Sequence, residues 1–136
     1  MNILVDSSVL IDVLGGRGGR PVLLRRLLAE GSLLCSCDIT LAEVYCGMRD
    51  REREVTEAFL GSLFYIPSDP ETARQAGVLR RDWRVKGHSL ALADTFLAAL
   101  ALRHGLLLLT DNVRHFPMRG LLVRRPEELR KASERR

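Results

Sequence analysis

Short apolar runs alternate along the chain with longer segments in which apolar residues recur at helical spacing. The short runs predict buried strands, and the periodic segments predict amphipathic helices. We expect strands at residues 2–5, 32–36, 64–67, 106–109 and 121–123. We expect helices at residues 8–14, 21–30, 40–48, 50–63, 70–86 and 89–104, followed by a charged C-terminal helix or tail over 126–136.

Proline and glycine support several of these boundaries. Pro21 suits the first turn of a helix, and Gly105 suits the position just after a helix ends. Within the segment 50–63, the spacing predicts one buried face formed by Val55, Phe59, Leu60 and Leu63. Strands that alternate with helices predict an α/β fold, with a parallel sheet of about four to five strands covered by helices on both faces.

The composition fits one domain of ordinary size. The chain has 136 residues, of which 46% are hydrophobic, so we expect a single domain over 1–136. No apolar run approaches the roughly 18 residues needed to span a bilayer, and Asp6 interrupts the N-terminus where a secretory signal would be apolar. We therefore expect a cytoplasmic protein without a membrane segment. The net charge of +4 favours an anionic partner, with nucleic acid as the first candidate.

Four acidic residues lie in apolar or small-residue surroundings. Asp6 and Asp111 each follow an expected strand, whereas Glu43 and Asp94 lie in the first or second turn of expected helices. In open α/β sheets, ligands bind at the carboxyl ends of the strands, so the four carboxylates can converge on one edge. An ionised carboxylate out of water costs several kcal/mol unless it is paired or bound to a cation. A divalent metal ion would satisfy all four at once.

Each acid also has a simpler explanation. Thr40 and Glu43 match a capping box, in which Glu43 would bond back to the backbone N–H of Thr40. Asp6 fits a helix cap, and Asp111 fits an ordinary turn. Asp94 is harder to explain, because it is the only charged residue of its helix ahead of the last turn, although a salt-bridge partner from elsewhere would account for it. The joint pattern is stronger than any one of its members.

The segments around these acids resemble the motifs of PIN-domain nucleases. The stretch 3–12 (ILVDSSVLID) is similar to the first motif, 40–44 (TLAEV) to the second, 92–101 (LADTFLAALA) to the third and 109–116 (LTDNVRHF) to the fourth. The motifs stand in the order of the family and cover nearly the whole chain. The size and the motif forms are most similar to VapC-type toxins, the ribonuclease half of toxin–antitoxin pairs.

The resemblance implies a PIN-like domain that hydrolyses RNA phosphodiester bonds with one or two Mg²⁺ or Mn²⁺ ions. Oxygen-only ligands suit such hard cations. The implied metal ligands and catalytic residues are Asp6, Glu43, Asp94 and Asp111. Ser7, Thr110 and Asn112 would support them. In many relatives the fourth acid lies at the position of Asn112, and we expect Asp111 to take that role here because a carboxylate stabilises a hard cation more than an amide does.

Basic residues near these motifs are candidates for RNA contacts. Arg17 and Arg20 lie in a glycine-rich loop, for which a plain solvated connection is about as good an explanation. Arg84 and Lys86 flank Trp83, whose ring would stack on a base or would simply be buried.

The resemblance also implies two protein partners and leaves other functions open. A small antitoxin would insert near the acids, and a second copy of the chain would form a homodimer. The alternatives are a housekeeping RNA-processing nuclease with the same site, or a catalytically silent PIN module that only binds RNA or protein. His115 is expected to be a solvated turn residue, because the metal mechanism requires no imidazole.

Overall fold

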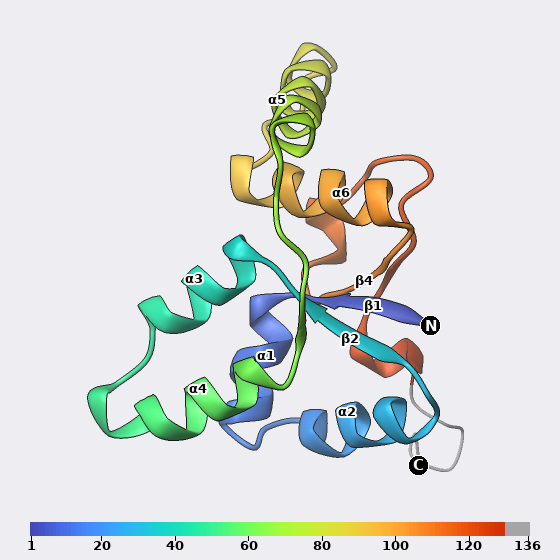
Figure 1. The fold of residues 1–136 in the computed structure, drawn as a ribbon. Coiled ribbons are helices and arrows are strands. Elements are labelled where there is room, and N and C mark those ends of the chain that lie inside the picture. The colour runs from blue at the N-terminus through green and yellow to red at the C-terminus, as the bar shows by residue number, and fades with distance from the viewer. Residues whose placement is uncertain (130–136) are drawn as a thin grey trace.

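A five-stranded parallel sheet forms the centre of the molecule (Figure 1). The computed structural model describes residues 1–129, so the part of the expected C-terminal tail beyond them lies outside the described residues. The strands are β1 (Asn2–Val5), β2 (Leu33–Ser36), β3 (Phe64–Tyr65), β4 (Leu107–Leu109) and β5 (Val123–Arg124), in the spatial order β3-β2-β1-β4-β5. The predicted parallel sheet is confirmed. Its order reverses at β1, which pairs with both β2 and β4.

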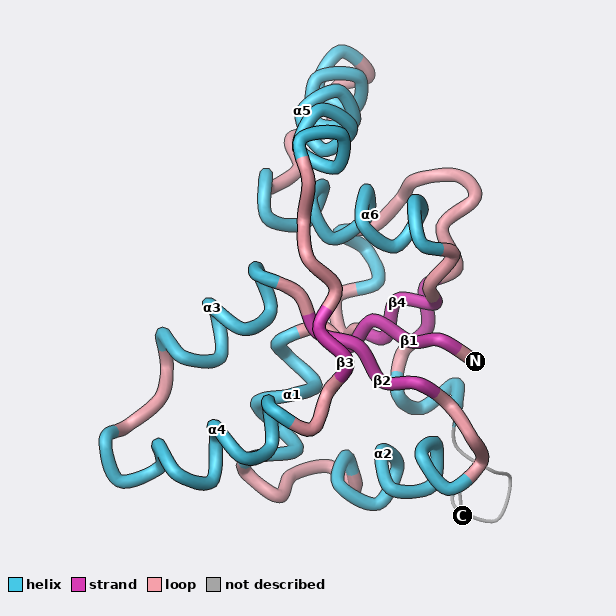
Figure 2. Tube along the Cα trace, in the orientation of Figure 1, coloured by secondary structure: helices cyan, strands magenta, loops and turns pink. Residues whose placement is uncertain are grey.

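Helices cover both faces of this sheet (Figure 2). They are α1 (Ser7–Leu14), α2 (Arg20–Ala29), α3 (Asp38–Cys46), α4 (Arg53–Gly61), α5 (Pro70–Val85) and α6 (Leu92–His104), with short 3₁₀ turns at η1 (Asp50–Glu52), η2 (Val113–His115) and η3 (Pro126–Leu129). α6 packs on one face with α5 against its outer side, and α1, α2 and α4 pack on the other (Figure 1). Within residues 1–129, none of these helices combines the length and the apolar character that crossing a membrane requires.

The alternation of side chains along β1 divides the core into two clusters. Ile3 and Val5 pack with Leu10 of α1 on one face, whereas Leu4 packs with Leu97 of α6 on the other. All three β1 side chains are fully buried, because the strand has a neighbour at each edge and helices on both faces. The uninterrupted apolar run at the N-terminus is therefore what a central parallel strand requires.

The segment 50–63 differs from the prediction. It divides into η1 and α4, and Val55 is 67% exposed, so its expected place on the buried face is wrong. Thr56 is buried instead, one turn before Leu60, which reaches the core together with Leu63. Phe59 is partly buried and packs against the same cluster, so of the four predicted residues only Val55 faces away from the core.

Candidate active site

Asp6 lies where β1 passes into α1, at the carboxyl edge of the central strand. Its side chain is buried, and both carboxylate oxygens accept hydrogen bonds. The backbone N–H of Ser7 donates to Oδ1 at 2.8 Å, and the hydroxyl of Thr110 donates to Oδ2 at 2.7 Å. Thr110 reaches Asp6 because β4 is the parallel neighbour of β1, with Val5 in register with Leu109. The carboxylate is therefore held in one orientation from two elements.

Glu43 lies in the second turn of α3, and it does not form the capping box that its spacing with Thr40 suggested. The helix begins at Asp38, two residues earlier than expected, and Cys37 is its N-cap. The fully buried Thr40 therefore lies inside the first turn, where its hydroxyl accepts a hydrogen bond from the backbone N–H of Cys37 at 3.0 Å. Glu43 is left to face the edge of the sheet.

Asp94 lies in the first turn of α6, which begins at Leu92, three residues later than expected. Its side chain is mostly buried, and its Oδ2 lies 3.2 Å from Nδ1 of His115 in η2. Sequence reasoning assigned His115 to solvent, and its ring is indeed partly exposed, but it contacts a candidate metal ligand. The signal available in the sequence was its place four residues after Asp111, in a turn that follows β4 at the same edge of the sheet.

These three acids interact electrostatically with one another. Burial raises the pKa of Glu43 above its ordinary value, and the charges of Asp6 and Asp94 raise it further, while a hydrogen bond from Ser7 opposes the shift. Burial also raises the pKa of Asp94; His115 opposes this shift, and the charge of Asp6 adds to it. We refer to Asp6, Glu43 and Asp94 as the three-acid cluster. Its members come from β1, α3 and α6.

Asp111 has a different electrostatic environment. Its Oδ1 lies 2.8 Å from Nη2 of Arg20, and Nη1 of the same guanidinium lies 2.8 Å from Glu127 of η3. Burial raises the pKa of the Asp111 carboxyl, and Arg20 opposes the shift. Arg20 is only 7% exposed and also lies 3.8 Å from Asp12. We therefore do not carry Arg20 forward as an RNA contact, because its guanidinium faces acids inside the protein.

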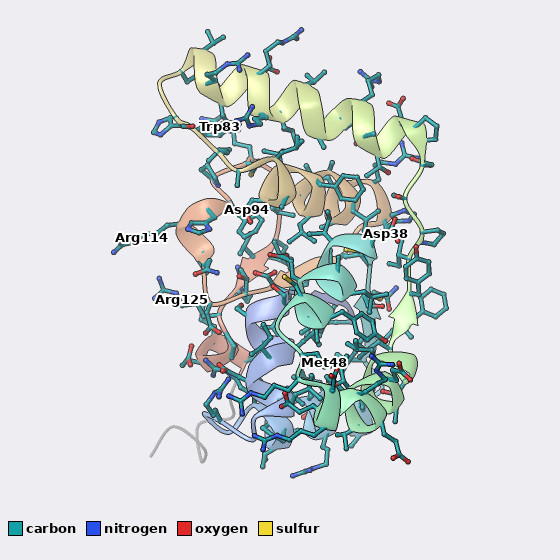
Figure 3. The ribbon with its side chains drawn as sticks, turned by 90° about the vertical axis from the view of Figure 1, so that its left-hand side faces the viewer. Asp38, Met48, Trp83, Asp94, Arg114 and Arg125 are labelled. Carbon is teal, nitrogen blue, oxygen red and sulfur yellow. The ribbon has the colours of Figure 1, made fainter. Side chains whose placement is uncertain are left out.

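The other predicted residues lie close to this edge or on the surface. The backbone N–H of Asn112 donates to the Thr110 hydroxyl at 3.0 Å, and the side chain of Asn112 is exposed. Arg17 is exposed and pairs with Asp12 at 3.1 Å. Arg84 and Lys86 are exposed at the end of α5. Figure 3 shows the nearby Trp83 on the same side of the molecule as Asp94.

Known proteins resemble this chain over most of its length. The model of the PIN domain matches residues 3–118. The chain belongs to the PIN-domain family. Ribonuclease VapC10 of Mycobacterium tuberculosis is 38% identical over 116 residues, which cover 85% of this chain and 86% of that protein. Ribonuclease VapC19 of the same organism is 32% identical over 115 residues, or 85% of this chain and 92% of that protein.

A solved structure gives the same likeness in three dimensions. A toxin–antitoxin complex from Klebsiella pneumoniae contains a chain that superposes on this PIN domain with a TM-score of 0.75 and 26% identity. The match covers 91% of this chain and 97% of that chain. The resemblance inferred from the four motifs is thus confirmed for the family and for the fold.

The donor groups of this PIN domain fit a hard divalent cation by their chemistry. Carboxylate oxygens are the ligands that Mg²⁺ and Mn²⁺ prefer. Burial first, and then the neighbouring acids, raise the pKa values of Glu43 and Asp94, so a bound cation would favour their ionised forms. Within residues 1–129, no three His, Cys, Asp or Glu side chains are yet close enough to hold one ion together.

Proposed function

We propose that this PIN domain is a metal-dependent endoribonuclease that acts in the cytoplasm as the toxin of a VapBC-type toxin–antitoxin pair. The observation that carries the proposal is the three-acid cluster at the carboxyl edge of the central strand, in a chain whose curated relatives are named ribonucleases. The proposed ligands of Mg²⁺ or Mn²⁺ are Asp6, Glu43 and Asp94. Asp111 is the proposed ligand at a second position, through Oδ2, because Arg20 is bonded to Oδ1.

Each residue has a role in this proposal. A divalent ion held by these carboxylates would supply positive charge that favours deprotonation of the attacking water and stabilises the negative charge on the phosphoryl and leaving oxygens. Thr110 and Ser7 hold Asp6 in a fixed orientation, and His115 holds Oδ2 of Asp94. Glu43 acts either as a metal ligand or as the base that accepts a proton from the attacking water, and a pKa raised by burial favours the second role.

We also propose two protein partners. An antitoxin covers the edge of the sheet and places a basic group against the three-acid cluster, and support comes from the Klebsiella pneumoniae neighbour, which is a toxin–antitoxin complex. A second copy of the chain forms a homodimer through apolar helix surfaces such as those around Val85 and Leu92, which are exposed.

The first test is RNA cleavage by the purified protein with Mg²⁺ or Mn²⁺. Asp6→Asn and Asp94→Asn should each lower the cleavage rate by at least about a thousandfold, since each removes a charge that the reaction needs. Asp82→Asn, at an exposed position on α5, is the matched control and should cleave normally. Circular dichroism should show that all variants are folded. RNA binding without any metal-dependent cleavage would instead support the silent binding module.

The second test separates a toxin from a housekeeping nuclease. Expression of the protein in bacterial cells should stop growth, and Asp94→Asn should restore it. Coexpression of a small DNA-binding protein encoded immediately upstream should also restore growth. A solitary gene whose overexpression is harmless would favour the housekeeping function.

A further inference from the structure

A cavity of about 460 Å³ opens beside Asp94, between the loop that joins α5 to α6 and the η2 turn. Loop residues 87–91 line one side, and Arg114 and His115 line the other. The volume falls within the range of about 300–1,000 Å³ that is typical of small-molecule sites. Because the cavity shares Asp94 with the three-acid cluster, its occupant would lie next to the reacting bond.

Two polar side chains of the cavity wall form no ion pair or hydrogen bond with other residues of the described chain. The guanidinium of Arg114 is exposed and forms no ion pair with residues 1–129. Figure 3 shows Arg114 projecting outward on the same side of the molecule as Asp94. The hydroxyl of Ser89 has no hydrogen-bond partner among the same residues. A cation and a hydroxyl are thus available at the wall of the cavity.

The aromatic groups around the cavity have distinct positions. The ammonium of Lys86 lies 4.7 Å above the centre of the Trp83 ring, and His88 meets Trp83 edge-on with 5.4 Å between ring centres. Trp83 is also partly buried against the core cluster that contains the apolar residues of α6. Trp83, which the sequence suggested as a surface for stacking, therefore supports the loop, and the rings that line the cavity are those of His88 and His115.

We propose that this cavity binds one ribonucleotide of the substrate, next to the phosphodiester bond that is cut. The phosphate pairs with Arg114, the base stacks on the imidazole of His88, and Ser89 bonds to the edge of the base. A basic side chain of a protein partner fits the cavity less well, because the positive charge of Arg114 would repel it. This proposal rests on the proposed ribonuclease function and adds to it the residues that hold the nucleotide: Arg114 at the phosphate, and His88 and Ser89 at the base.

The first experiment measures binding without metal and without cleavage. Isotope-labelled protein in EDTA is titrated with AMP, GMP, CMP and UMP and followed by NMR. We expect shifts concentrated at residues 87–91 and 114–115, with one base preferred. Arg114→Ala and His88→Ala should each weaken binding about tenfold, the loss expected for a charge-assisted hydrogen bond or a stacked ring. Arg25→Ala, which removes an exposed arginine from α2, is the control and should bind normally.

The second experiment compares cleavage of RNA by the same variants. Arg114→Ala should raise KM about tenfold or more, and His88→Ala should change the preferred base at the cut. The proposed nucleotide site would be contradicted if no nucleotide bound or if the NMR shifts lay elsewhere in the protein. It would also be contradicted if Arg114→Ala and Arg25→Ala bound nucleotides equally well. If the wild type cuts RNA and Arg114→Ala has the same KM and base preference as the wild type, the proposed nucleotide site is wrong, but the proposed ribonuclease function is supported. If nucleotides bind through Arg114 but the protein cuts no RNA, the nucleotide site is supported and the ribonuclease function is contradicted.

A protein ligand is the remaining outcome to separate. The affinity of the antitoxin encoded upstream is measured with the same three variants. If Arg114→Ala weakens antitoxin binding and leaves the binding of all four nucleotides intact, the cavity is a protein contact and the proposal is overturned.

Discussion

At the scale of single residues, Glu43 and Asp94 carry charges that the folded protein does not fully compensate. Burial and the neighbouring acids raise the pKa of both carboxyls, so the folded chain binds protons more tightly at these two positions than the unfolded chain does. The free energy of unfolding must then fall as the pH rises through the raised pKa values. The site therefore costs stability at neutral pH in exchange for cation affinity.

This cost predicts that Glu43→Gln and Asp94→Asn raise the melting temperature of the metal-free protein at pH 7. The difference from the wild type should shrink as the pH falls through the raised pKa values toward the ordinary pKa of a carboxyl, about 4, because protonation removes these charges from the wild type as well. Excess Mg²⁺ should reverse the order, since only the wild type keeps all its ligands. Glu57→Gln on the exposed face of α4 is the control. Melting curves in EDTA that place both variants below the wild type at pH 7 would contradict the expected coupling.

The fourth acidic position gives a second prediction at this scale. Asp111→Ala should lower cleavage strongly and raise the Mg²⁺ concentration required, because it removes a carboxylate beside the site. Asn112→Ala should have only a mild effect, since its exposed side chain lies in the loop and its backbone makes the bond to Thr110. Metal titrations of cleavage and direct Mn²⁺ binding measure both. Full activity of Asp111→Ala at low Mg²⁺, with collapse of Asn112→Ala, would assign the fourth position to Asn112.

At the scale of elements, Arg20 joins parts of the chain that are far apart in sequence. It begins α2, and its guanidinium binds the loop after β4 through Asp111 and binds η3 through Glu127. The sequence predicted the positions of both β4 and α2, but it could not predict that Arg20 joins α2 to the loop after β4 and to η3. The side chains lie 91 and 107 positions from Arg20, and no local pattern records such a pairing.

Removing the bridge should destabilise the protein. Arg20→Met removes the positive charge opposite Asp111 and Glu127. We expect a loss of about 2 kcal/mol, below the 3–5 kcal/mol of a fully buried pair, because both carboxylates are partly solvated. Urea unfolding measures the loss. Arg25→Met on the same helix is exposed and should change stability little. Equal stability of the two variants would show that the bridge contributes nothing net.

Other differences between expectation and structure also arise where local signals compete. The spacing of Thr40 and Glu43 satisfies a capping motif, yet the helix starts earlier because Cys37 can cap it and Thr40 can close the first turn. Val55 and Thr56 both stand one turn before an apolar residue, and only packing against the sheet decides between them. The strands and the acids at their ends were predictable, because a central parallel strand must be wholly apolar until it leaves the sheet.

At the scale of the whole molecule, a net charge of +4 should attract RNA as a polyanion. Binding of single-stranded RNA by the Asp94→Asn variant should weaken linearly on a plot of log affinity against log salt, with a slope of about −0.7 for each phosphate neutralised. Adding Arg84→Ala should make that slope shallower by about 0.7, since it removes one exposed cation near the site. Fluorescence anisotropy over a range of NaCl concentrations measures it. An unchanged slope would show that Arg84 does not contact the RNA phosphates.

The hydrogen bond from Thr110 to Asp6 has a consequence for how the protein is made. It joins positions 104 residues apart, and β4, which carries Thr110 to the edge of the sheet, is also the second neighbour of β1. A nascent chain that has already released β1, α3 and their acids still lacks α6 with Asp94 and the strand that fixes Asp6. Because a domain generally folds as a unit, this edge of the sheet forms only after α6 and β4 have left the ribosome. The proposed metal ligands therefore come together only after the chain up to about Thr110 has been synthesised.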